Sequence, residues 1–231
     1  MSLKATKALL KVYGKENIEV LSCMGMLGIA YRYRGRWKEA EELEVQVMEI
    51  RKRVLREEHP STLASMANLA STYRNQGRWK EAEELEVQAM ETRKRVLGEE
   101  HPDTLTSMAN LASTYMNQGR WKEAEELQAK GLKICSRVLG EEHPDTLTSI
   151  NNLAFTFKAQ GRNDKAILLM EKCFQLRKKV LSAHHPYTAS SLATLNGWQA
   201  GEYRDWSLKR LYFVCCTLII VLGVAWKRLL S

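Results

Sequence analysis

Apolar and polar positions alternate with helical spacing inside a unit of 42 residues that recurs along this chain. Between residues 60 and 76, apolar side chains fall three and four residues apart, at Leu63, Met66, Ala70 and Tyr73. This spacing places them on one face of an α-helix, called helix A here. A second stripe lies between about residue 78 and residue 97 and predicts a helix B whose inner face carries Trp79, Ala82, Leu85, Ala89 and Val96.

The ends of both helices carry residues that favour these boundaries. Pro60 suits the first turn of helix A, where the missing N–H has no partner to lose, and Gly77 suits the left-handed position just past its end. Helix B begins near Glu81, Glu83 and Glu84 and ends near Arg93, Lys94 and Arg95. This order of charges is the one that the helix dipole favours.

Several residue types return every 42 positions: His59, His101, His143 and His185, each followed by proline; Trp37, Trp79 and Trp121; and Tyr31, Tyr73, Tyr115 and Phe157. One helix pair buries little surface alone, so successive pairs must stack into a solenoid. We therefore divide the chain into a helix B remnant (1–17), a divergent repeat (18–58), repeats 59–100, 101–142 and 143–184, and a terminal partial repeat (185–205). Residues 186–195 still follow helix A, but Gly197, Trp198 and Gly201 interrupt the pattern.

The repeated motif HPDTLTSMANLASTYMNQGRWKEAEEL resembles the tetratricopeptide repeat in its longer 42-residue form, over roughly residues 4 to 200. The family's packing positions are filled by Leu111, Ala112, Tyr115, Gly119, Trp121 and Ala124. The resemblance is to kinesin light chains and to arrays attached to nucleotide-binding modules of fungal immune-like proteins. It implies an all-α, right-handed superhelical solenoid of antiparallel helix pairs. It also implies a scaffold that binds a protein or peptide in a groove lined by helices A.

Polar residues beside the apolar stripe of helix A are the candidate ligand contacts. Asn68, Asn110 and Asn152 share one register, and Asn75 and Asn117 share another. The resemblance implies that asparagine holds a ligand backbone, a task that suits an amide because it both donates and accepts. The alternative is that these asparagines only tie neighbouring helices together. Arg74 and Lys158 favour an acidic ligand, unless they are merely solvated charges at the groove edge. A lysine-rich carboxylate clamp is not expected, because Ala67, Ser71, Ala109 and Ser113 occupy the neighbouring positions.

No catalytic or metal motif is present in the sequence, so we expect no enzyme, no cofactor and no small-molecule substrate. The His-Pro pairs are expected to cap helices rather than bind metal, and the tryptophans to pack rather than stack on bases. The net charge of +8 lies entirely in residues 158–231, which carry 12 Lys/Arg and 4 Asp/Glu. These charges flank an apolar segment, so nucleic acid is not expected as a partner.

The apolar segment 211–226, LYFVCCTLIIVLGVAW, is bracketed by Lys209, Arg210, Lys227 and Arg228. As a helix it would span about 24 Å, slightly less than a ~30 Å hydrocarbon core. We expect a single-pass C-terminal membrane anchor with the repeats in the cytosol, where the odd number of cysteines would stay reduced. The alternative is a cytoplasmic protein in which this segment caps the last repeat. A further alternative for the whole chain is a sensor or regulatory array detached from a larger nucleotide-binding immune-like protein.

Overall fold

The computed structural model describes residues 12–201, and all regular structure in that range is helical. The helices A are α2 (Ile18–Tyr33), α4 (Pro60–Asn75), α6 (Pro102–Asn117) and α8 (Pro144–Ala159). The helices B are α3 (Trp37–Leu55), α5 (Trp79–Leu97), α7 (Trp121–Val138) and α9 (Asn163–Leu181), and residues 186–201 form one more helix. The predicted helix pairs are confirmed to within about a residue at each end.

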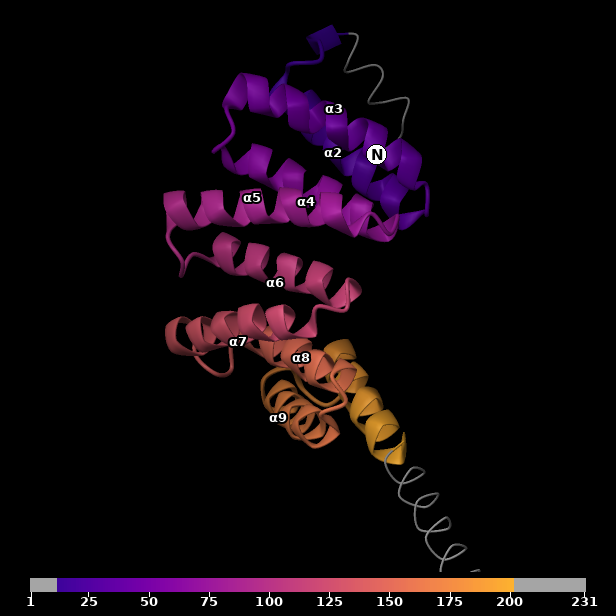
Figure 1. Cartoon of the computed structure of the whole chain (residues 1–231), viewed down its shortest axis with the longest axis vertical. Coiled ribbons are helices and arrows are strands. Elements are labelled where there is room, and N and C mark those ends of the chain that lie inside the picture. The colour runs from indigo at the N-terminus through magenta and orange to yellow at the C-terminus, as the bar shows by residue number, and fades with distance from the viewer. Residues whose placement is uncertain (1–11, 202–231) are drawn as a thin grey trace, which may run out of the picture. The chain divides into compact units, whose positions relative to one another are not determined.

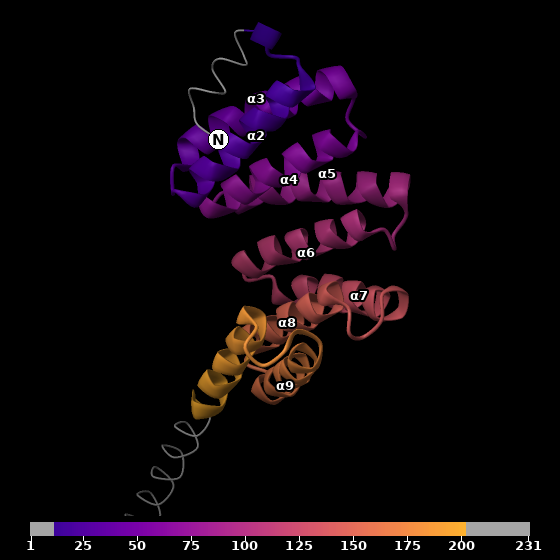
Figure 2. The same cartoon turned by 180° about the vertical axis from the view of Figure 1, so that it is seen from behind.

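The described chain divides into two compact units, one ending at Ser149 and the other beginning at Ile150. In the first unit each helix packs against the next along the chain, from α2 to α7, as Figures 1 and 2 show from opposite sides. Helix α4 also contacts both α2 and α6, whereas the helices B make fewer contacts with one another. In a curved stack of two helix layers, the helices of the inner layer lie closer to one another than those of the outer layer. The helices A therefore line the concave face of this unit.

Histidine side chains fix the start of the helices A. The Nδ1 atom of His59 accepts a hydrogen bond from the Ser61 backbone N–H at 3.1 Å, and His101, His143 and His185 do the same two residues ahead. This confirms the predicted capping role. Gly77 ends helix α4 with φ +77°, a conformation that suits glycine.

The core of the first unit lies between the two helix layers. Leu63, Met66 and Ala70 of α4 are buried, as are Ala82 and Ala89 of α5. The predicted inner face of helix B is wrong at its two ends, because Trp79 is 41% exposed and Val96 is 46% exposed. Trp37 and Trp121 are exposed to a similar extent. The tryptophans are therefore partly exposed at the first residues of α3, α5 and α7.

The second unit contains most of α8, all of α9 and the helix of residues 186–201. Ala166, Met170 and Cys173 on α9 are buried, together with Leu195 from the last helix. That helix continues through Gly197 and Trp198 to residue 201, so the expected interruption of the pattern does not end the helix. Trp198 packs edge-on against Phe155 with ring centroids 5.2 Å apart, which gives the later residues a packing role within this unit.

Two expectations fall on residues outside the described range. They are most of the helix B remnant in residues 1–17 and the apolar segment 211–226. Between residues 12 and 201, none of the helices has both the length and the apolar composition needed to cross a bilayer.

Candidate functional site

The candidate site in the first unit is the exposed face of the helices A. Asn68 on α4 and Asn110 on α6 are half-buried at equivalent positions. Within the described part of the chain, their side-chain amides make no hydrogen bond to another protein group. The alternative in which these amides tie neighbouring helices together therefore has no support in this unit. Asn75 and Asn117 are exposed at the last residues of α4 and α6.

Arginines make the tie between successive helices A instead. Nη1 of Arg32 donates to the backbone carbonyl of Asn68 at 2.8 Å, and Nη1 of Arg74 donates to that of Asn110 at 3.1 Å. The Arg74 side chain is 18% exposed, and its Nη2 lies 3.3 Å from the Ser71 hydroxyl. Arg74 is therefore part of the wall of this face and not a solvated charge at its edge.

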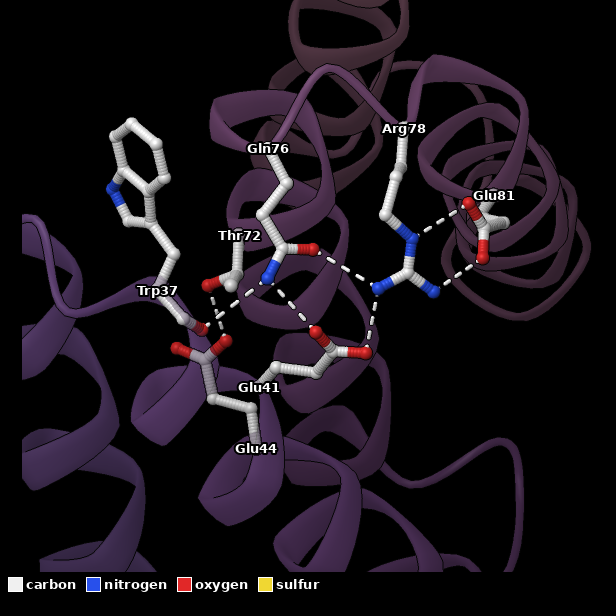
Figure 3. A network of polar contacts seen from close by, with 7 residues as sticks. All are labelled: Trp37, Glu41, Glu44, Thr72, Gln76, Arg78 and Glu81. Atoms are coloured by element: carbon white, nitrogen blue, oxygen red, sulfur yellow. Dashed lines mark hydrogen bonds and ion pairs between the residues drawn. The ribbon is translucent and has the colours of Figure 1, made fainter.

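A buried carboxylate lies behind each of these arginines. Glu86 is 2% exposed, accepts a hydrogen bond from the Thr114 hydroxyl at 2.5 Å and lies 3.5 Å from Arg74. Glu44 has the same arrangement with Thr72 at 2.5 Å, shown in Figure 3, and with Arg32 at 4.0 Å. In both glutamates Oε1 is buried without a hydrogen bond. Burial raises the pKa of both carboxyl groups, against the opposing effects of the threonine hydroxyl and the arginine.

A second set of arginines was missed at the level of sequence. Arg93, near the end of α5, is only 7% exposed, and its Nη1 donates to the Ser107 hydroxyl on α6 at 2.6 Å. Arg51 on α3 is similarly buried and donates to the Ser65 hydroxyl at 2.8 Å and to the Ser22 hydroxyl at 3.2 Å. The helix-dipole interpretation placed Arg93 with its exposed neighbours, but the side chain enters the interface between repeats.

These buried guanidinium groups lack the usual counter-charge. Among residues 12–201, no carboxylate oxygen lies within ion-pair distance of Arg51 or Arg93. Burial lowers the pKa of both groups, and the charge of Asp103 partly opposes this effect at Arg93. Arg51 reaches from a helix B to hydroxyls on two successive helices A, α2 and α4. Its guanidinium therefore lies between these two helices A.

The third repeat of the first unit replaces all of these charges. Met116 takes the place of Arg74, Gln128 that of Glu86 and Cys135 that of Arg93, each 42 residues later. Cys135 is buried, and its Sγ accepts from the Ser149 hydroxyl at 3.8 Å. Burial raises the pKa of its thiol. The serine position is thus kept while the arginine that used it is lost.

The second unit holds the remaining predicted contacts. Asn152 is half-buried on α8, and Nζ of Lys158 lies 5.6 Å from the centre of the Trp198 ring. Arg177 repeats the buried arrangement of Arg93, donating to the Ser191 hydroxyl at 2.7 Å. The structure therefore places Asn152 and Lys158 on the same helix, with Lys158 beside an aromatic ring.

A polar network at the turn between helices A and B holds adjacent repeats together. Gln76 donates to Glu41 at 2.8 Å, and Arg78 pairs with both Glu41 and Glu81 (Figure 3). The Arg78 guanidinium also lies 4.2 Å from the centre of the Tyr73 ring. The indole of Trp37 points away from this network (Figure 3). Because the network satisfies its own charges, we assign it a structural role.

Between residues 12 and 201, no group of three or more His, Cys, Asp or Glu side chains is arranged so that it could hold a metal ion. The capping histidines lie one repeat apart, consistent with this result.

Comparisons with known proteins place these features in a family. Models described as tetratricopeptide repeat match residues 20–61, 62–103 and 108–179. A solved structure of a putative kinesin light chain from Podosopora anserina, with nearly identical TPR-like repeats, is 35% identical with a TM-score of 0.70, over 82% of this chain and 90% of that one. No curated protein sequence matches the chain.

More distant structures share the fold. BtubC (BKLC) from P. vanneervenii is 19% identical with a TM-score of 0.69, over 88% of this chain and 82% of that one. The apo form of RapI is 14% identical with a TM-score of 0.61, over 80% of this chain and 70% of that one. The family models and the 35% identical relative decide the assignment: this chain belongs to the tetratricopeptide-repeat family, among arrays like those of kinesin light chains.

Proposed function

We propose that this chain is a non-catalytic scaffold that binds an extended, acidic segment of a partner protein on the concave face of its helices A. Tetratricopeptide repeats generally form scaffolds that bind proteins. The acidic preference is inferred from Arg93, a buried guanidinium that donates to the Ser107 hydroxyl. Asp103 is not within ion-pair distance of Arg93, and a carboxylate from a ligand would supply a closer counter-charge.

The amides of Asn68 and Asn110 are proposed to hold the backbone of this segment. An amide offers two donors and an acceptor, which matches the alternating groups of an extended peptide. Asn75 and Asn117 extend the same face toward the ends of α4 and α6, and Asn152 and Lys158 supply corresponding contacts in the second unit. Arg74 contributes positive charge close to Asn110. Binding by a pre-formed face avoids the free-energy cost of ordering the protein.

Binding should be tested with the purified full chain and rhodamine-labelled peptides, using fluorescence anisotropy. Peptides with aspartate at alternate positions should bind, and the same peptides with asparagine should bind at least tenfold more weakly. Arg93→Cys introduces the residue that the third repeat already carries, so the fold should be retained. This variant should lose roughly tenfold in affinity, as expected for a charge-assisted hydrogen bond.

Arg95→Gln is the matched control. Arg95 lies on the same helix but is exposed and pairs with Glu58 at 2.7 Å. Its removal should leave affinity unchanged, while circular dichroism confirms that both variants fold. Equal affinities of the chain, R93C and R95Q for the aspartate peptide would contradict the proposed role of Arg93, and no binding at all would contradict the proposed function.

We also propose that residues 211–226 anchor the array in a membrane. The support is the sequence, namely sixteen residues with Thr217 as the one hydrophilic side chain and basic residues on both sides. Carbonate extraction of the expressed chain, with and without residues 207–231, tests this. The whole chain should stay with the membrane fraction and the shortened chain should not. Release of both forms would contradict the anchor.

A further inference from the structure

Arg74 contacts both the helices A and a buried carboxylate. Its Nη1 donates to the Asn110 carbonyl, and its Nη2 lies 3.3 Å from the Ser71 hydroxyl. The same Nη1 lies 3.5 Å from Oε1 of Glu86. The charge that Arg74 offers to the face therefore depends on whether Glu86 is ionised.

The arrangement occurs twice in the first unit. Arg32 contacts the Asn68 carbonyl at 2.8 Å and Glu44 at 4.0 Å, and Glu44 is as deeply buried as Glu86. In the third repeat both members of the pair are neutral, as Met116 and Gln128. Within the first unit the arginine and the glutamate are thus present together or absent together, whereas in the second unit Lys158 and Met170 occupy the two positions.

We propose that these arginine–glutamate pairs make acidic-ligand binding depend on pH, with Glu44 and Glu86 as positioning residues that take up protons when the ligand binds. The proposal rests on the proposed function. A protonated glutamate leaves its arginine without a counter-charge, and a ligand carboxylate then supplies one. By linkage, ligand binding must promote proton uptake to the same extent that acidification promotes binding.

The surroundings of each carboxylate favour the neutral form. Glu86 is faced by Arg74 from α4 and the Thr114 hydroxyl from α6, with Glu83 on its own helix. Glu44 is faced by Arg32 from α2 and the Thr72 hydroxyl from α4. Burial has the largest effect on both carboxyl groups and raises the pKa of each. Glu44 and Glu86 therefore take up a proton at a higher pH than an ordinary glutamate, whose pKa is 4.5.

The first measurement is anisotropy of the rhodamine-labelled aspartate peptide between pH 7.5 and pH 5.5. Aspartate stays ionised throughout this range because its unperturbed pKa is about 3.9. The chain should bind roughly fivefold more tightly at pH 5.5, a typical size for coupling between two sites. Glu44→Gln/Glu86→Gln should bind tightly at both values, because glutamine keeps the acceptor for threonine and carries no charge.

Two controls separate this effect from other titrating groups. Glu58→Gln removes an exposed carboxylate paired with Arg95 and should keep the full pH dependence. Met116→Arg/Gln128→Glu builds the pair into the third repeat and should make the pH dependence steeper. If E44Q/E86Q retains the pH dependence of the unmodified chain, the capping histidines or other groups cause it and the proposal is overturned.

Urea unfolding gives a readout that does not need the ligand. Because the folded-state pKa is raised, ionised Glu44 and Glu86 oppose folding above that pKa, and the unmodified chain gains stability as the pH falls through it toward the ordinary pKa of glutamate. Its urea midpoint should therefore rise relative to that of E44Q/E86Q between pH 7.5 and pH 5.5. A constant difference between the midpoints overturns the proposal. If the midpoint rises but no peptide binds at any pH, protonation of the two glutamates is confirmed. The proposed function and the coupling of proton uptake to ligand binding are then both contradicted.

Discussion

The second and third repeats of the first unit share most of their sequence but differ in their buried charges. Both begin with a capped helix A and keep the same turn network, with Arg78 and Arg120 in equivalent pairs. The second repeat contains Arg74, Glu86 and Arg93, whereas the third contains neutral residues at all three positions. The helices pack in the same way in both repeats, so these charges are not required for the fold. The first repeat carries the same charges as Arg32, Glu44 and Arg51, and the proposed ligand binding would account for them.

The largest expected effect comes from breaking the second repeat's ion pair. Arg74→Met leaves Glu86 buried without its cation and should lower the free energy of unfolding by about 3 kcal/mol. Arg74→Met/Glu86→Gln reproduces the third repeat and should lie within about 1 kcal/mol of the unmodified chain. Urea unfolding at pH 7.5 measures both. If the double variant were as unstable as the single one, the two repeats would not be interchangeable in this way.

Backbone strain distinguishes the first repeat from the next two. Arg56 has φ +73°, at the position where Gly98 and Gly140 have φ +89° and +91°. Arginine in this conformation is strained, so Arg56→Gly should stabilise the chain by about 1 to 2 kcal/mol. Thermal unfolding measures the change. Gly98→Ala is the reverse experiment and should destabilise the chain. A less stable R56G variant would show that the arginine side chain makes a favourable contribution larger than the strain.

A smaller effect is expected from the helix caps. His101→Ala removes the acceptor for the Asp103 backbone N–H and should destabilise the chain by about 1 kcal/mol. His184 lies next to the cap His185 and serves as the control, since it is exposed. Thermal unfolding of H101A and H184A should separate the two. Equal losses would mean that the capping bond contributes little.

Features set by neighbouring residues were predictable from the sequence. The proline, histidine and glycine positions determine where the helices A begin and end, and the structure confirms those boundaries. Asn68 and Asn110 were also identified from their register, and their free amides support a role as ligand contacts. Their binding role stays a prediction.

Features that depend on contacts between repeats were harder to predict from the sequence. Arg93 is followed by charged residues in a last turn, so helix-dipole reasoning groups it with exposed neighbours. Its burial depends on Ser107, fourteen residues later on another helix. A signal was present, because Arg51, Arg93 and Arg177 are each followed after fourteen residues by Ser65, Ser107 and Ser191. Trp79 and Val96 were misplaced because the ends of a helical stripe extend beyond the partner helix that covers its centre.

The most direct test of an acidic-ligand site is to move the arginine between the two repeats. Cys135→Arg gives the third repeat a guanidinium beside Ser149, the equivalent of Ser107. In anisotropy measurements with the aspartate peptide, R93C should bind more weakly than the unmodified chain, C135R more tightly, and the double variant between R93C and C135R. Identical affinities in all four folded proteins would contradict the account.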